Sequence, residues 1–438
     1  MKKEVSLDII DISTEGKGVG KKDRLTYFVR GARFGDKIRA EVTDYKKNYA
    51  EAKVIDLIEV SPYYEEPACP YTNFCDGCQF QDIRYQAQVD YKKNQIIEKI
   101  NRIAHESLED IEFAQAFERY AYRNKIELKV DLYGHLSYYS RKTNANVAIK
   151  SCLIASEKIN DIMIVLQEQI KIFELTGFDA KKNYGLIKNI MIRATDLGQT
   201  MVVMVLKEDY DLGEFSQSLK ESGLIDSFYL SINPRRNNHR ILKPRLIFGQ
   251  EKIEEQMGDK RFLISPQSFF QVNSKQAYQI YQDAKALVKK VSPSSIIDLY
   301  SGISTTSILM SDLAEKILSV EIVQAAVEDG KENAKLNGIQ NIDFLQGDAG
   351  QIIKDIELDL ESPLLLVDPP RKGLDQAIIE VIGQSSIDNV IYISCNPATL
   401  ARDIKGFKDY GFKLKHIKGY DMFVNTLHVE ALVLMIRT

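Results

Sequence analysis

The five cysteines of this chain fall into two groups that suggest two kinds of chemistry. Four lie upstream, at Cys69, Cys75, Cys78 and Cys152, and the fifth, Cys395, lies far downstream in the run Ile-Ser-Cys-Asn-Pro. Three of the upstream cysteines fall within ten residues and the total is odd, which does not fit the disulfide framework of a small secreted protein. The upstream group therefore predicts a metal centre, and Cys395 predicts a nucleophile.

The upstream group offers four thiolates, with the spacing Cys-x5-Cys-x2-Cys and one distant cysteine. Four thiolates are enough for a 4Fe-4S cluster or for a tetrahedral zinc ion. The spacing alone does not distinguish iron-sulfur from zinc. A set of structural cysteines without metal is a third interpretation.

Cys395 follows an apolar, strand-like run and precedes Asn396 and Pro397, which end the strand abruptly and expose the position. A thiolate at the end of a strand is placed for nucleophilic addition to a substrate. The structural alternative is a small core residue, which is the commoner fate of a lone cysteine.

Acidic residues follow successive predicted strands in the last third of the chain. The run from Asp298 to Gly302 closes the first strand, and its glycine lets the backbone approach a ligand lying across the strand ends. Glu321 ends the next strand, 23 residues after Asp298, a spacing suited to ribose hydroxyls. The missing GxGxxG fingerprint weakens the dinucleotide interpretation. Asp348 and Asp368, after the third and fourth strands, favour S-adenosylmethionine as the cofactor.

These residues need a scaffold of alternating strands and helices, and residues 266–438 supply that pattern. Strand-like runs alternate there with helical stretches, the strands being SIIDLY, ILSVEI, IDFLQGD, LLLVDPP and VIYISCN. Such alternation is typical of βαβ units and a largely parallel sheet. The sequence therefore predicts a Rossmann-like α/β domain over residues 266–438.

Two further domains are predicted upstream. Residues 1–58 contain short strands separated by glycine-bearing turns, which favours a small OB-like β-barrel. A proline-punctuated acidic segment at residues 61–67 marks a boundary. Residues 59–265 hold the cysteine group, a helical pattern from Arg84 to about Ile103, and strands mixed with a second helix. They are predicted to form an α+β central domain.

Composition excludes several protein classes. Of 438 residues, 44% are apolar and 27% are charged, which is ordinary for a soluble globular protein. No stretch approaches the roughly 20 apolar residues of a membrane span, and acids stand where a signal peptide needs an apolar run. We therefore expect a cytoplasmic protein with no membrane partner.

The net charge of -4 argues against indiscriminate coating of nucleic acid, but two segments are locally basic. Residues 1–58 carry 13 Lys and Arg against 10 Asp and Glu, and residues 235–245 form a second basic run. A basic run taken alone is usually solvated surface. Together with the motifs above, these two favour an enzyme that acts on nucleic acid.

The motifs occur in the order found in a known family. The runs DLYSG, VEIVQAAVEDGKENAKLNG, DPPRKG, ISCNP and HVEALVLM follow one another as in the RNA uracil-5-methyltransferases, which the chain resembles over its whole length. Its first segment resembles a TRAM domain, and the match is similar to the iron-sulfur branch that acts on 23S ribosomal RNA. The resemblance implies a class I S-adenosylmethionine-dependent methyltransferase domain, a 4Fe-4S cluster on the four upstream cysteines, and a target uridine flipped out of an RNA loop.

The resemblance also implies roles for single residues. Cys395 would add to carbon 6 of uracil, because carbon 5 is a poor nucleophile until the ring is activated. Glu430 would remove the carbon 5 proton, and His428, on the same face of the predicted strand, is the rival base. The implied cofactor contacts are Gln271, Tyr300, Glu321, Asp348 and Asp368.

One departure from the family keeps other functions open. The family usually has glycine where this chain has Ser304, and a side chain there could crowd the cofactor. A catalytically decayed RNA-binding factor is therefore one alternative, and a tRNA uracil-5-methyltransferase is another. The bacterial tRNA enzyme of the family resembles only the central and catalytic parts, which counts against the second. No obligate protein partner is expected.

Overall fold

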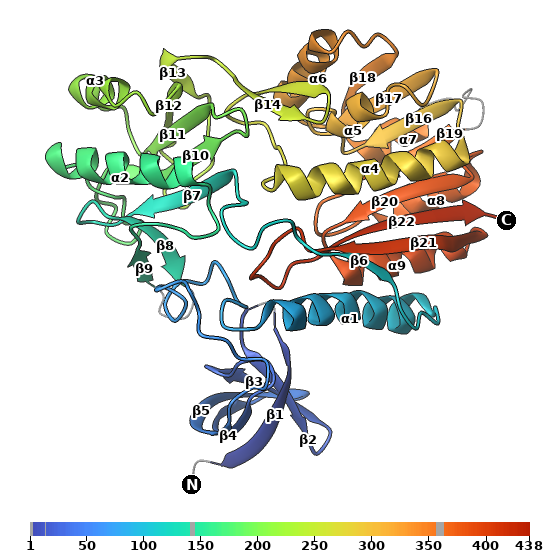
Figure 1. Cartoon of the computed structure of the whole chain (residues 1–438), viewed down its shortest axis with the longest axis horizontal. Helices are drawn as coiled ribbons and strands as arrows, with labels where there is room; N and C mark the ends of the chain where they lie inside the picture. Colours follow the sequence, from blue (N-terminus) through green and yellow to red (C-terminus); the bar gives the residue numbers. More distant parts are fainter. Residues whose placement is uncertain (1–2, 14, 141–144, 356–362) are drawn as a thin grey trace. The chain divides into compact units, whose positions relative to one another are not determined.

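The structure is a computed structural model that describes residues 3–13, 15–140, 145–355 and 363–438 (Figure 1). By its contacts the chain divides into two compact units. The first contains Met1–Lys92, Tyr139–Ala145 and Asn425–Leu427, and the second contains Lys93–Tyr138, Asn146–Val424 and His428–Thr438. The predicted boundaries at 1–58, 59–265 and 266–438 follow a different criterion and stay a prediction.

The first unit is built on a closed five-stranded barrel with the strand order β1-β2-β3-β5-β4. Its strands are β1 (Glu4–Ile12), β2 (Gly18–Lys22), β3 (Leu25–Arg30), β4 (Lys37–Tyr45) and β5 (Tyr49–Glu59). Buried and exposed residues alternate along β1, so that Val5, Leu7 and Ile9 fill the barrel. The predicted N-terminal β-barrel is confirmed.

One barrel strand was not predicted. The glycine spacing places Gly18 in a turn, whereas the structure has it as the first residue of β2. A Cβ on Gly18 would lie 2.8 Å from the Cβ of Ala32. Glycine is therefore required here for close packing inside the barrel rather than for a turn.

The cysteine loop, which we define as residues 60–84, connects the barrel to helix α1 (Tyr85–Ala104). Phe80 and Ile83 of this loop are buried in the barrel core together with Tyr91 of α1. The rings of Phe80 and Tyr91 meet edge to face with their centroids 4.9 Å apart. Aromatic packing thus fixes the end of the loop to the barrel.

A seven-stranded sheet has the order β13-β12-β11-β10-β7-β8-β9. All residues of β10 and β11 are buried, which explains the uninterrupted apolar run from Met201 to Leu206 in β11. Two helices, α2 (Glu157–Ile172) and α3 (Gly213–Glu221), pack against each other beside it (Figure 1). The strands are β7 (Lys125–Val130), β8 (Leu136–Ser140), β9 (Ala145–Ala148), β10 (Ile187–Ala194), β11 (Thr200–Leu206), β12 (Ser227–Ile232) and β13 (Arg245–Gly249).

The carboxyl-terminal sheet has eight strands in the order β18-β17-β16-β19-β20-β22-β21-β6. The strands β16 to β20 pair in parallel, and β22 is inserted antiparallel between β20 and β21. The strand order reverses between β16 and β19, where open α/β sheets bind ligands. The strands are β6 (Glu112–Ala114), β16 (Ser295–Leu299), β17 (Lys316–Glu321), β18 (Ile342–Gln346), β19 (Pro363–Val367), β20 (Asn389–Ser394), β21 (Phe412–Tyr420) and β22 (Glu430–Arg437).

Helices cover both faces of this sheet, as the predicted Rossmann-like fold requires (Figure 1). Ile296 packs into one core cluster and Ile297 into the other, because successive side chains of β16 point to opposite faces. One face is covered by α4 (Ser274–Val291), α5 (Thr305–Leu309) and α6 (Gln324–Leu336). The other is covered by part of α1 and by α7 (Ala349–Asp355), α8 (Gln376–Gln384) and α9 (Pro397–Lys408).

A hairpin of β14 (Ile253–Met257) and β15 (Lys260–Ile264) leads into α4.

Among the helices that the structure describes, none combines the length and the hydropathy needed to cross a lipid bilayer.

Candidate active site

A cavity of about 510 Å³ opens at the carboxyl ends of the parallel strands in the second unit. It lies at the switch point between β16 and β19, and it is large enough for a small-molecule cofactor. The cavity brings together six of the seven residues predicted for catalysis and cofactor binding. They are Gln271, Tyr300, Glu321, Asp368, Cys395 and Glu430.

The antiparallel insertion of β22 brings the predicted nucleophile and base to the same cavity. Cys395 directly follows β20, and Glu430 is the first residue of β22. Ser394 pairs with Ala431 across the two strands, so the end of β20 lies beside the beginning of β22. Cys395 and Glu430 are 35 positions apart in the sequence, but they lie at neighbouring strand ends in the fold.

Both groups are shifted toward their protonated forms. Burial, together with the negative charges of Glu430 and Asp368, raises the pKa of the Cys395 thiol to about 11. Burial and the charge of Asp368 raise the pKa of Glu430 well above its usual range. Groups with perturbed pKa values in a cavity are candidates for acid-base and nucleophilic chemistry.

His428, the rival base, forms a hydrogen bond with Arg371. The guanidinium of Arg371 lies 3.0 Å from Nε2 of His428, and a guanidinium can only donate. Nε2 therefore accepts, which requires a neutral imidazole with its proton on Nδ1. The backbone of Arg371 is fixed as well, because its carbonyl oxygen accepts hydrogen bonds from Asn396 Nδ2 at 2.9 Å and Thr399 Oγ1 at 3.3 Å.

The cofactor end of the cavity is shaped by the turn after β16. Tyr300 and Gly302 have left-handed backbones, with φ of 64° and 56°. No atom lies within 4 Å of a Cβ placed on Gly302, so the backbone faces open space there. The carboxylate of Glu321 accepts hydrogen bonds from the backbone N–H of Gly302 at 3.0 Å and of Val323 at 2.8 Å. These two bonds fix the carboxylate at the cavity edge.

Ser304 does not crowd this cavity. Its side chain is buried, and its hydroxyl shares a hydrogen bond of 2.7 Å with Ser319 on β17. Ser319 in turn donates to Ser301 Oγ at 2.9 Å. Ser304 is absent from the described lining of the cavity. The local backbone therefore accommodates the serine, and the steric reason to expect an impaired site is removed.

Asp298 lies near the end of β16, as the sequence predicts, but its hydrogen-bond partners were not predicted. Its Oδ2 accepts hydrogen bonds from Thr306 Oγ1 at 2.5 Å and Ser307 Oγ at 2.6 Å. Its Oδ1 is buried and has no hydrogen-bond partner among the described residues. Burial raises the pKa of Asp298 to about 6, and burial with the charge of Asp298 raises the pKa of Asp368 to about 7. Two buried carboxyls with raised pKa values therefore lie near the carboxyl ends of β16 and β19.

Asp348 is the predicted residue that the cavity does not include. Its Oδ1 accepts hydrogen bonds from the backbone N–H of Gly350 at 3.0 Å and Gln351 at 3.2 Å. These bonds cap the start of α7. Its predicted contact with the cofactor stays a prediction.

Aromatic residues around the cavity were missed by sequence reasoning. Phe269, Phe270 and Phe423 line it, and Phe269 is 63% exposed although it is fully apolar. An exposed ring at a cavity is a platform for stacking a flat ligand. The only sequence signal was the pair of phenylalanines immediately before Gln271.

The upstream cysteines occur in both compact units. Cys69, Cys75 and Cys78 belong to the first unit and Cys152 to the second. All four are half-buried thiols rather than disulfides. Within the described ranges, no group of three or more His, Cys, Asp and Glu side chains is placed to hold a metal ion. The predicted metal centre is therefore not shown.

Two local features nevertheless suit cysteines that bind metal. The backbone N–H of Gly77 donates to Cys75 Sγ at 3.4 Å, and such bonds stabilise thiolates. The backbone of Cys152 is held by Asn160, whose Oδ1 accepts from its N–H at 2.8 Å and whose Nδ2 donates to its carbonyl at 3.2 Å. The donor set is thus chemically compatible with an iron-sulfur cluster or zinc.

The sheet order, its helices on both faces and the cavity at the switch point define a methyltransferase-like α/β enzyme with an appended barrel. A family model described as tRNA (Uracil-5-)-methyltransferase matches residues 84–438. The chain belongs to this family of RNA uracil-5-methyltransferases. The matched range excludes the barrel and three of the upstream cysteines.

Relatives cover the rest of the chain. An uncharacterized RNA methyltransferase of Clostridium tetani is 33% identical over 98% of this chain and 95% of its own length. One of Clostridium acetobutylicum is 34% identical over 99% and 96%. The crystal structure of a Pyrococcus abyssi tRNA (uracil-54, C5)-methyltransferase in complex with S-adenosyl-L-homocysteine is similar over 98% of this chain and 99% of its own, with a TM-score of 0.81 and 24% identity. That similarity supports the fold, including the N-terminal barrel.

Proposed function

We propose that this protein methylates carbon 5 of uridine in 23S ribosomal RNA, with S-adenosylmethionine as methyl donor and a covalent Cys395 adduct as intermediate. The observation that carries the proposal is the cavity in which Cys395 and Glu430 meet Gln271, Tyr300, Glu321 and Asp368. A thiol nucleophile next to a carboxyl base suits a carbon atom that must be activated first and deprotonated later. A cytoplasmic location fits this activity.

The chain offers suitable groups for S-adenosylmethionine. Glu321, fixed by two backbone N–H groups, would bond the ribose hydroxyls, and the open backbone at Gly302 would let the cofactor approach. Gln271, Tyr300 and Asp368 would complete the contacts. Asp348, which caps α7, is a further proposed contact outside the described lining of the cavity. The Pyrococcus abyssi structure contains the demethylated product of this cofactor, which supports the choice.

The proposed chemistry uses Cys395 first and Glu430 second. The Cys395 thiolate, its proton having passed to solvent, adds to carbon 6 of the uracil, and the carbon 5–carbon 6 π electrons form an enolate. S-adenosylmethionine supplies the methyl group that carbon 5 acquires. Glu430 then accepts the carbon 5 proton, the carbon 6–sulfur bond breaks, and the double bond and the thiolate are restored.

Glu430 is favoured over His428 as the base. A carboxylate with a raised pKa is a stronger base than an ordinary carboxylate, and burial supplies that shift. Nε2 of His428 accepts from Arg371 and has no lone pair left for a second proton. The proposed role of His428 is therefore to orient Arg371 at the substrate edge of the cavity.

The choice of 23S ribosomal RNA rests on the resemblance of the barrel and cysteines to the TRAM and iron-sulfur branch of the family. The alternative substrate is tRNA, and one observation favours it. The Pyrococcus abyssi enzyme, which its name assigns to uracil-54 of tRNA, is similar over 98% of this chain. A barrel is therefore compatible with either substrate, and the four upstream cysteines carry the preference for ribosomal RNA.

We also propose that Cys69, Cys75, Cys78 and Cys152 bind a 4Fe-4S cluster. The support is chemical: four half-buried thiols, the N–H to sulfur bond at Cys75 and the Asn160 clamp on Cys152. Zinc is the competing metal, because it accepts the same ligands.

The test is transfer of labelled methyl from S-adenosylmethionine to unmodified 23S ribosomal RNA and, in parallel, to unmodified tRNA. Label recovered as 5-methyluridine in 23S ribosomal RNA supports the proposal, and its position identifies the target. Label only in tRNA would keep the chemistry and overturn the substrate. No label in either RNA, from protein that binds both RNA and S-adenosylmethionine, would favour the RNA-binding alternative.

A further inference from the structure

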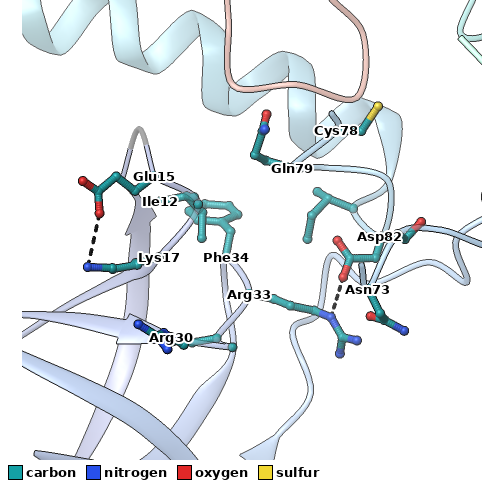
Figure 2. A pocket seen from close by; sticks show the side chains of 15 residues that line it. Ile12, Glu15, Lys17, Arg30, Arg33, Phe34, Asn73, Cys78, Gln79 and Asp82 are labelled. Carbon is teal, nitrogen blue, oxygen red and sulfur yellow. Dashed lines mark hydrogen bonds and ion pairs between the residues drawn. The ribbon is translucent and has the colours of Figure 1, made fainter. Parts of the chain in front are cut away.

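A second cavity, of about 390 Å³, lies within the first unit (Figure 2). Its walls come from two parts of the chain that are 38 positions apart at their nearest, at Phe34 and Thr72. One wall is formed by the barrel, from the turn before β2 and the loop after β3. The other is formed by the cysteine loop, which contributes Thr72, Asn73, Cys78, Gln79, Asp82 and Ile83.

The two walls present flat apolar surface and polar groups to the same space. Figure 2 shows Ile12 and Phe34 on one side of the gap and Asp82 on the other. The ring of Phe34 is held rigidly, because it stacks on Tyr63 with centroids 5.4 Å apart and meets Tyr91 edge to face at 5.1 Å. A rigid aromatic side and a polar side together suit a planar heterocycle with hydrogen-bonding edges.

Most charges around this cavity are paired. Arg33 Nε lies 2.5 Å from Asp82 Oδ2, and its guanidinium also lies over the ring of Tyr64 at 4.9 Å. Lys17 Nζ contacts Glu51 Oε2 at 2.9 Å and Glu15 Oε2 at 3.2 Å. These cations are therefore already neutralised.

Arg30 is different. It lines the cavity at the end of β3, is exposed, and makes no ion pair with any residue that the structure describes. Asn73 on the opposite wall is also exposed. The rim thus carries an uncompensated guanidinium, which favours a phosphate, and a primary amide, which can donate to or accept from a base edge.

We propose that this cavity binds one unpaired nucleotide of the RNA substrate, with its base against Phe34 and its phosphate at Arg30. The volume falls in the range of small-ligand sites, roughly 300–1,000 Å³, and suits a nucleotide but not a duplex. The inference rests on the proposed function, because it assumes that the substrate is RNA. It adds a second contact outside the catalytic cavity, for a nucleotide other than the target uridine.

The site also gives the cysteine loop a direct task in substrate binding. Cys78, a proposed cluster ligand, lines the same cavity as Asn73 and Asp82. A metal that fixes Cys78 would therefore also fix the wall that the nucleotide contacts. RNA affinity should depend on the conformation of this loop.

The test compares two double variants of the full chain. Arg30→Ala with Asn73→Ala removes the phosphate and base contacts. Lys21→Ala with Asn48→Ala likewise removes one cation and one amide, from exposed barrel residues outside the cavity. All four side chains are exposed, so neither variant loses core packing. Affinity for a single-stranded RNA substrate is measured over a range of salt concentrations, and crosslinks from 4-thiouridine in that RNA are mapped.

The cavity variant should bind RNA about tenfold more weakly than wild type, since it loses the phosphate contact of Arg30 and the base-edge contact of Asn73, which together contribute about that much. The slope of log affinity against log salt concentration should become less steep by about 0.7, which corresponds to one lost phosphate contact on a single strand. Wild-type crosslinks should map to residues 12–34 or 72–83, and the control variant should match wild type.

Equal affinities for the two double variants, together with normal methyl transfer, would overturn this inference and leave the proposed function intact. Crosslinks confined to the second unit would do the same. A wild-type enzyme that transfers no methyl group to RNA would overturn both.

Discussion

Gly330 leaves the space that Ser304 occupies, because a Cβ on Gly330 would lie 2.7 Å from Ser304 Oγ. Ser304 has a left-handed φ of 61°, which costs a residue with a side chain about 1–2 kcal/mol. Its hydrogen bond to Ser319, at 2.7 Å, offsets about 1 kcal/mol of that cost. The departure from glycine at position 304 is therefore accommodated by glycine at position 330.

Gly330→Ala should destabilise the protein by about 1–3 kcal/mol, the usual cost of overpacking a buried site. Ser304→Gly in the same chain should recover most of this loss, because it removes the side chain that the new methyl group meets. Urea unfolding of the two single variants and the double variant measures the coupling. Strictly additive effects would show that the two positions do not share space.

Glu430→Gln should stop the reaction after methyl transfer, since glutamine cannot accept the carbon 5 proton. The expected product is a covalent protein–RNA adduct that survives a denaturing gel, and Cys395→Ala in the same background should abolish it. The matched control is His428→Asn, which should turn over and leave no adduct. Normal turnover by Glu430→Gln would instead make His428 the base.

Methyl transfer should accelerate as the pH rises. Burial and nearby carboxylates raise the pKa of Cys395 to about 11, so the thiol is mostly protonated at neutral pH. The thiolate fraction then grows about tenfold per pH unit below that pKa. Single-turnover rates between about pH 6.5 and 8.5 test this, and a flat or falling profile would contradict rate-limiting thiolate attack.

Protein purified without oxygen should contain iron and sulfide and absorb visible light. Cys78→Ala should lose the colour, because a four-thiolate site loses a ligand. Cys395→Ala is the matched control and should keep it, since Cys395 lines the other cavity. A colourless preparation that contains zinc would replace the cluster with a zinc site.

Much of the catalytic sheet could be predicted because its signals are local. The strands ending at Leu299, Glu321 and Ser394 are short and largely apolar, and parallel topology carries their carboxyl ends to one edge of the sheet. Glycine at position 302 likewise signals a close approach, and the structure has its backbone facing open space. Residues at the carboxyl ends of parallel strands can therefore be predicted to lie close together without knowledge of how their side chains pack.

The features that escaped prediction depend on packing between distant segments. The sequence predicts Gly18 in a turn, because the neighbour that requires a glycine there, Ala32, lies 14 positions further along the chain. The pairing of Arg371 with His428 joins residues 57 positions apart and makes Nε2 of His428 a hydrogen-bond acceptor. The direction of the Ser304 side chain depends on Ser319 and Gly330. No spacing rule carries information of this kind.

Strand β22 is synthesised after both strands between which it lies, β20 and β21. Glu430, the first residue of β22, is therefore the last of the described cavity residues to be synthesised. Insertion of this late strand between two strands made earlier completes the described lining of the cavity.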